Sequence, residues 1–121
     1  MYELSIEDCF SAAHAISTGG VREPVHGHDW HVTVTIGGPR LDEDGLLCDF
    51  HTLQEALRSV TRAFHHRDLN ATPPFDRTNP TAELVARHIA DRLLPLMPEE
   101  ARLLSVRVTE TPGCAATYRP Q

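Results

Sequence analysis

The sequence predicts an α+β domain over residues 1–121, in which two strands, two helices and two further strands follow one another along the chain. Three observations support this prediction. Apolar and polar residues alternate near both ends of the chain, which is the pattern of strands with one buried face. In the middle of the chain, apolar residues instead recur at the spacing of a helix face. Hydrophobic residues make up 40% of the composition, which is typical of a single packed domain of this length.

The first two strands are expected to begin at residue 2 and at residue 30. Tyr2, Leu4 and Ile6 alternate with polar residues. The second strand runs from Trp30 to Ile36, again with alternation, and the G-G-P sequence at residues 37–39 closes it.

Two amphipathic helices are expected in the middle of the chain. The first begins near Phe50, and its apolar stripe consists of Leu53, Ala56, Leu57, Val60 and Phe64. For the second helix, we expect Asn79 as the N-cap and Pro80 at the first helical position. Its stripe consists of Leu84, Val85, Ile89 and Leu93, and prolines at positions 95 and 98 end it. Residues 70–76 between the helices are rich in proline and asparagine, which predicts a loop.

The last two strands are expected over residues 104–110 and 115–119, with a turn at residues 111–113. Leu104, Val106 and Val108 alternate with polar residues, so Glu110 falls on the apolar side of its strand. A carboxylate on a buried face needs partners, and it offers two oxygens to a ligand with two parallel N–H donors. The alternative, that the strand ends at Thr109 and Glu110 points to solvent, is about equally compatible with the sequence.

Charge and composition narrow the range of partners. The formal net charge is −6, and all eleven basic side chains are arginine, with no basic stripe among them. We therefore expect no nucleic-acid partner. The first residues lack the pattern of a signal peptide, and no segment has the length of a membrane span, so we expect a cytoplasmic protein that does not enter the membrane. Three cysteines without paired spacing fit reduced thiols.

Histidines provide the strongest chemical signal. His26 and His28 are separated by one glycine, and on an extended backbone they project from the same face, where both can reach one metal ion. This face continues through Trp30 and is apolar, so unpaired imidazoles there would be costly. His14 ends another strand-like segment and offers a third ligand. Three imidazoles with one open position are typical of catalytic zinc. Hydrogen-bonded or solvated histidines at a strand edge remain the alternative.

Six short motifs together resemble one protein family. They are F-S-A-A-H at residues 10–14, H-G-H at 26–28, D-F at 49–50, H-H before L-N at 65–70, N-P-T-A-E at 79–83 and E-T at 110–111. In this order they are similar to the 6-pyruvoyltetrahydropterin synthase and 6-carboxytetrahydropterin synthase family, over essentially the whole chain. The resemblance implies a tunnelling fold, which is a four-stranded antiparallel sheet with two helices on one side. It also implies trimers, or hexamers built as dimers of trimers, with active sites between subunits.

The resemblance also implies roles for individual residues. His14, His26 and His28 would be the zinc ligands, and Glu110 would anchor the pterin ring through its 2-amino and N3–H edge. Thr81, in the family's P-T-x-E segment, would lie near the pterin as well.

Two departures from the family pattern concern the catalytic groups. Arg22 occupies the position of the family's usual catalytic cysteine. Glu23 instead gives the sequence E-x-x-H-G-H, which looks like the family's glutamate variant, so Glu23 is the expected general base. A solvated loop carboxylate is the alternative. His66 aligns with the histidine of the family's proton relay, and His65 replaces the aspartate that usually orients it.

The expected function is therefore that of a zinc-dependent lyase or synthase of pterin metabolism. By resemblance, the substrate would be 7,8-dihydroneopterin or its triphosphate, and the product a carboxypterin, a pyruvoylpterin or a hydroxymethylpterin, on the queuosine, biopterin or folate routes. The alternative is a repurposed relative that binds zinc and pterin without catalysis.

Overall fold

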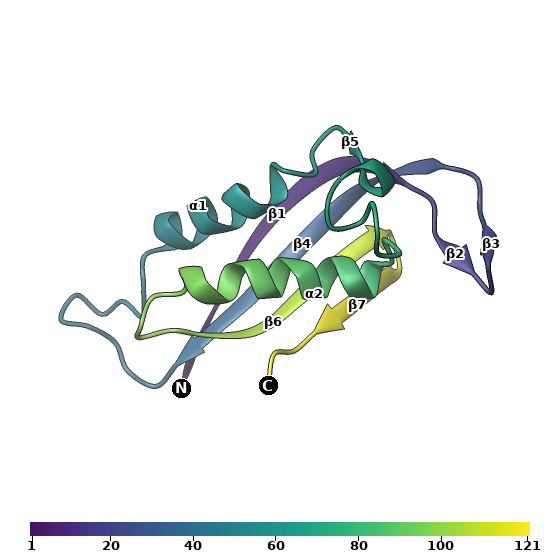
Figure 1. Cartoon of the computed structure of the whole chain (residues 1–121). Helices are drawn as coiled ribbons and strands as arrows, with labels where there is room; N and C mark the ends of the chain where they lie inside the picture. The colour runs from purple at the N-terminus through teal and green to yellow at the C-terminus, as the bar shows by residue number, and fades with distance from the viewer.

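Two helices cover one face of a single twisted sheet (Figure 1). The computed structural model describes residues 1–121. Four strands pair antiparallel in the order β1 (Tyr2–His14), β4 (His26–Gly38), β6 (Arg102–Thr111) and β7 (Cys114–Tyr118). The helices are α1 (Phe50–Thr61) and α2 (Ala82–Leu93). These elements confirm the predicted fold class and the predicted order of elements.

The sheet has one strand more than predicted. A fifth strand, β5 (Arg67–Asp68), pairs parallel with β1 at its outer edge. A separate hairpin of β2 (Ser17–Thr18) and β3 (Val21–Arg22) projects from the end of the sheet where β1 leads into β4 (Figure 1). Strands of two residues carry no alternation of apolar and polar residues, so the sequence could not indicate them. No helix of the chain is both long enough and apolar enough to cross a membrane.

The core lies between the sheet and the two helices. Trp30, Val32, Val34 and Ile36 of β4 are fully buried, as their alternation predicts. The ring of Phe10 from β1 stacks on Trp30 at a centroid distance of 5.8 Å. Burying each of these large side chains contributes about 1.5–3 kcal/mol, which fixes the face that β1 and β4 turn toward the helices. No helix covers the opposite face of the sheet (Figure 1).

The predicted face of β6 is wrong at its first apolar position. Leu103 is buried and Leu104 only half-buried, because the register with β4 shifts between Thr35 and Ile36. Leu104 is the extra residue of this irregularity, and it packs over Gly37, where a Cβ atom would lie 2.7 Å from its Cδ1. Ser105 is buried as well, and the predicted alternation holds from Val106 to Val108. The strand continues past Glu110, which excludes the alternative that it ends at Thr109.

The start of α2 also differs from the prediction. Thr81, and not Asn79, is the N-cap, since its side chain accepts a hydrogen bond from the Leu84 N–H at 3.2 Å. Pro80 therefore precedes the cap and does not occupy the first helical position. Threonine and asparagine both cap helices well, so local sequence does not choose between them. Here the Asn79 side chain is engaged elsewhere, by the main chain of Ser17.

Close packing at the end of β4 predicts that a side chain at Gly38 destabilises the fold. A Cβ atom on Gly38 would lie 2.5 Å from Leu47 Cδ1 and 2.7 Å from the main-chain oxygen of Glu100. Because a main-chain oxygen cannot move aside as a side chain can, we expect Gly38→Ala to lower the free energy of unfolding by about 1–3 kcal/mol in urea denaturation. Gly27→Ala is the matched control on the same strand, since nothing lies within 4 Å of its Cβ position. Equal stability of the two variants would contradict this account.

Candidate metal centre

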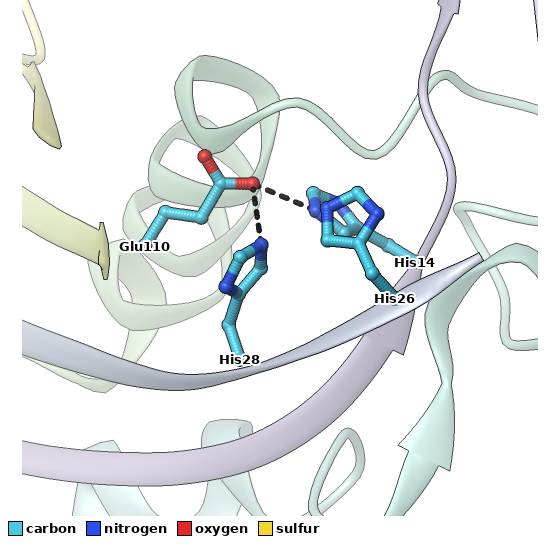
Figure 2. A group of neighbouring side chains, drawn as sticks. All are labelled: His14, His26, His28 and Glu110. Carbon is cyan, nitrogen blue, oxygen red and sulfur yellow. Dashed lines mark ion pairs between the residues drawn. The ribbon is translucent and has the colours of Figure 1, made fainter. Parts of the chain in front are cut away.

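Three histidines converge at the end of the sheet where β1 and β4 meet the hairpin. His14 and His26 are directly opposite each other in the β1–β4 pairing, and His28 lies two residues further along β4, on the same face. Glu110, near the end of β6, points toward them (Figure 2). One ligand atom from each of these four side chains lies within 4.8 Å of the others, so together they could hold a metal ion. The predicted histidine triad is therefore assembled within one chain.

Main-chain carbonyls set the orientation of two of the imidazole rings. His14 Nδ1 donates a hydrogen bond to the carbonyl oxygen of Pro80 at 2.8 Å, and His26 Nδ1 donates to that of Pro24 at 3.0 Å. A carbonyl oxygen can only accept, so the proton must be on Nδ1 in both rings. The Nε2 lone pairs of His14 and His26 are then available for a metal ion, which is the usual arrangement around metal-binding histidines.

His14 Nε2 shows most directly that the site suits a cation. This atom is buried and makes no hydrogen bond, although Glu110 Oε1 is only 2.7 Å away. With a proton on Nδ1, the short distance between Nε2 and the carboxylate oxygen calls for a positive charge, either a second proton on Nε2 or a bound cation. A metal ion bound by both atoms would supply this charge. The donor set of three imidazoles and a carboxylate oxygen fits Zn²⁺ and related divalent ions.

Burial favours the neutral form of the remaining imidazole. Desolvation lowers the pKa of His28, and the neighbouring His14 and His26 lower it further, while Glu110 acts in the opposite direction. A neutral imidazole is the form that binds a metal. Trp30 lies under the cluster, with its ring centroid 4.8 Å from that of His14, so the apolar core forms the floor of the site.

Glu23 lies at the rim of the cluster. Its Oε1 atom is 3.7 Å from His26 Nε2 and accepts a hydrogen bond from the Ile16 N–H at 3.0 Å. The Glu23 N–H in turn donates to the Ile16 carbonyl at 3.0 Å. The predicted base is therefore held beside the histidines by main-chain contacts and is not a freely moving loop side chain.

His65 and His66 do not join this cluster in the single chain. They follow α1 in an exposed turn, stack on each other at a centroid distance of 3.7 Å, and contact the main chain of Ser11 at the edge of β1. His66 lines a depression of about 560 Å³ that Ser11, Asp29 and His28 of the cluster also line. Ser11 and Asp29 alternate with the metal-site histidines along β1 and β4, so their side chains belong to the uncovered face of the sheet.

Glu110 borders a second depression, and Thr81 lies next in the sequence to residues that line it. Glu110 lines a space of about 500 Å³ together with Glu83 at the start of α2 and Cys114 at the start of β7. This volume is in the range of small-molecule sites. Thr81 directly precedes the two α2 residues that line this space, but its own side chain caps the helix.

Sequence reasoning missed the groups that orient the histidines. The carbonyl oxygens of Pro80 and Pro24 carry no signal in the residue pattern, because every residue has a carbonyl and only the fold decides where it points. The direct contact of Glu110 with the imidazoles was not predicted either, since the expected partner of Glu110 is the pterin ring and not a histidine.

Comparison with known proteins places this arrangement in a family. Residues 3–121 match the sequence model of the 6-pyruvoyl tetrahydropterin synthase family. The chain is 32% identical to the 6-carboxy-5,6,7,8-tetrahydropterin synthase of Bacillus subtilis, over 99% of this chain and 86% of that protein. It is 30% identical to the dihydroneopterin monophosphate aldolase of Pyrococcus furiosus, over 84% and 82% of the two chains.

The fold agrees with these sequence comparisons. The structure of Caenorhabditis elegans 6-pyruvoyl tetrahydropterin synthase matches with a TM-score of 0.87 and 26% identity, over 99% of this chain and 96% of that one. The similarity in fold therefore extends through the whole sheet and both helices. This chain belongs to the 6-pyruvoyl tetrahydropterin synthase family.

Proposed function

We propose that this protein is a zinc-dependent lyase that acts on the side chain of 7,8-dihydroneopterin or one of its phosphates. The observation that carries the proposal is the buried, unpartnered Nε2 atom of His14 among two further imidazoles and a carboxylate. The names of the relatives support the substrate class, since they include tetrahydropterin synthases and an aldolase for dihydroneopterin monophosphate. A cytoplasmic location remains a prediction.

His14, His26 and His28 would hold the zinc ion. When bound, zinc supplies positive charge that lowers the pKa of a coordinated hydroxyl and stabilises negative charge on oxygen. The composition supports this choice of electrophile. Cleavage of a carbon–carbon bond beside a carbonyl can also proceed through a lysine Schiff base, but all eleven basic side chains of this chain are arginine.

Glu23 would act as the general base in place of the cysteine that is common in the family, whose position is occupied by Arg22. One carboxylate oxygen of Glu23 is held by the Ile16 N–H, which leaves the other oxygen to accept a proton. Its place beside His26 puts it next to a side-chain hydroxyl of a substrate that approaches the histidines. Loss of that hydroxyl proton prepares the adjacent carbon–carbon bond for cleavage in the retro-aldol direction.

Glu110 would anchor the pterin ring. Its carboxylate borders the 500 Å³ depression, and its two oxygens match the parallel N–H donors of the 2-amino and N3–H edge. The contact with His14 is the competing role, because the same carboxylate could be a fourth metal ligand. Thr81, just before the α2 residues of this depression, stays a candidate for contact with the pterin.

His66 would return the proton in the site of a neighbouring copy, with His65 stacked against it. Both rings are exposed at the sheet edge, and neither belongs to the metal-binding cluster of their own chain. The uncovered face and the open edges of the sheet favour association into a trimer, or a hexamer made of two trimers. Such an assembly would bring the edge of one chain to the histidine cluster of the next.

A repurposed protein that binds zinc and pterin without turning the pterin over is the second candidate. Two substitutions favour it, Arg22 at the cysteine position and His65 at the position of the orienting aspartate. The same experiments separate the two functions.

Turnover is the decisive test. Zinc-loaded protein is incubated separately with 7,8-dihydroneopterin, its monophosphate and its triphosphate, and the pterin products are identified by mass spectrometry. We expect shortening of the side chain for at least one substrate. Glu23→Gln should lower kcat by about 10²–10⁴-fold, because the amide cannot accept the proton. Glu55→Gln, an exposed change on α1, should leave the rate unchanged. Binding of all three pterins without turnover would favour the second candidate.

Metal content gives a separate prediction. We expect one zinc ion per chain by elemental analysis after dialysis against metal-free buffer. His28→Ala removes one of three imidazole ligands and should abolish stoichiometric zinc together with turnover. His31→Ala is the matched control, since His31 is exposed on the same strand but points to the opposite face. Full zinc content in His28→Ala would show that the ion is not held by this triad.

The two roles of Glu110 make different predictions. If Glu110 anchors the ring, Glu110→Ala should raise the dissociation constant for the pterin by on the order of tenfold or more, because a charge-assisted pair of hydrogen bonds is lost. Zinc content should stay at one ion per chain. Titration calorimetry and elemental analysis measure both quantities, with Glu55→Ala as control. Loss of zinc with unchanged pterin affinity would identify Glu110 as a metal ligand instead.

A further inference from the structure

The chain contains two asparagines, and both bind the main chain of the same short segment, residues 15–17. The Asn70 side chain accepts a hydrogen bond from the Ala15 N–H at 2.7 Å and donates to the Ala15 carbonyl at 2.9 Å. The Asn79 side chain makes the same pair of bonds with Ser17, at 2.9 Å and 2.8 Å. Each amide therefore forms the pair of hydrogen bonds that a neighbouring strand would form, at residues that lie beyond the end of β1.

The residue between them is bound from the other side by Glu23. The Ile16 N–H donates to Glu23 Oε1, and the Ile16 carbonyl accepts from the Glu23 N–H, both at 3.0 Å. In an extended chain, the polar groups of successive residues point to opposite edges. Two asparagines on one edge and Glu23 on the other thus satisfy all the main-chain polar groups of Ala15, Ile16 and Ser17.

This segment directly follows His14, and each asparagine belongs to an element near the candidate site. Asn70 lies in the 3₁₀ turn η1 (Leu69–Ala71), just after the loop that carries His65 and His66. Asn79 immediately precedes Pro80, whose carbonyl accepts from His14. The side chains of Asn70 and Asn79 therefore connect the segment to two different loops.

We propose that Asn70 and Asn79 are positioning residues for Glu23. By fixing Ala15 and Ser17, they hold the Ile16 N–H at the place and angle where it binds Glu23 Oε1. This keeps the carboxylate beside His26, with its second oxygen free. The inference rests on the proposed function of Glu23 as the base, and it adds that the base is oriented by main chain that side-chain amides fix in place. An error of about 1 Å in the position of a reacting group can cost on the order of a hundredfold in rate.

Asn79→Ala is the more informative variant, because its bonds with Ser17 are exposed to solvent and water can replace them without unfolding the chain. We expect kcat to fall on the order of tenfold or more, KM to change less than about twofold, and zinc content to stay at one ion per chain. Asn70→Ala should behave likewise. Gln54→Ala, which removes an amide on α1 that makes no hydrogen bond, is the matched control and should retain the full rate.

A double-mutant cycle tests whether the asparagines act through Glu23. In the Glu23→Gln background, Asn79→Ala should lower kcat by less than about twofold, because the group that it positions can no longer act as a base. An undiminished effect in that background, or a loss of zinc that accounts for the lower rate, would overturn the proposal.

Hydrogen–deuterium exchange supplies a measurement that does not depend on turnover. In Asn79→Ala we expect faster amide exchange at Ser17 and also at Ile16, whose own acceptor, Glu23, is unchanged. Unchanged protection at Ile16 would contradict the proposal even if the enzyme is active. Faster exchange at Ile16 together with a full rate in Glu23→Gln would instead show that the asparagines do fix the segment and that Glu23 is not the base.

Discussion

The direct pairing of His14 with His26 across β1 and β4 is the constraint on which the candidate site depends. The two strands pair along thirteen residues each, and their apolar side chains alternate toward the helices over that length. A slip of one residue would turn Trp30 and the rest of the apolar face of β4 outward. The burial energy of the core therefore fixes the register, and the register brings the imidazoles together at the end of the sheet. The packing of the core is therefore enough to bring the two strands into the position that metal binding requires.

Sequence patterns could predict the elements whose side chains follow a regular period. The long strands and both helices are each set by many side chains with one period, so an error at a single position does not change the outcome. The histidine triad was predictable for the same reason, since its members continue the buried face of two long strands. Features set by one or two contacts were not predictable. The two-residue strand β5 has no period, and the shift at Leu104 depends on the space above Gly37.

The N-cap of α2 and the groups around the histidines illustrate a second limit of prediction from the sequence. Asn79 has the local preference of a cap, but its amide binds the distant main chain of Ser17, and Thr81 takes the cap position. In the same way, the orientation of His14 comes from the Pro80 carbonyl, sixty-six positions away in the sequence. Such contacts follow from the assembled fold, and no local pattern of residue types carries them.

The order of strands in the sheet separates Glu110 from His65 and His66. Glu110 reaches the histidines of its own chain because β6 pairs with β4 on the side away from β1. His65 and His66 lie toward the other edge of the sheet, beside β5, and His66 shares a depression with His28 of the same chain. Each protomer thus presents these chemical groups on two sides of the histidine cluster.

The three imidazoles differ in exposure, so the site is open to solvent on only one side of His14. The His14 side chain is sealed against the core with 1% of its surface exposed, whereas that of His26 is 39% exposed and that of His28 is 20% exposed. An ion held there would be reached past the exposed side chains of the cluster, which are His26, His28 and Glu110, with Glu110 25% exposed. Small chelators and the oxygen atoms of a substrate approach by this same route. A bound substrate would therefore cover the exposed side of the cluster and slow the escape of an ion.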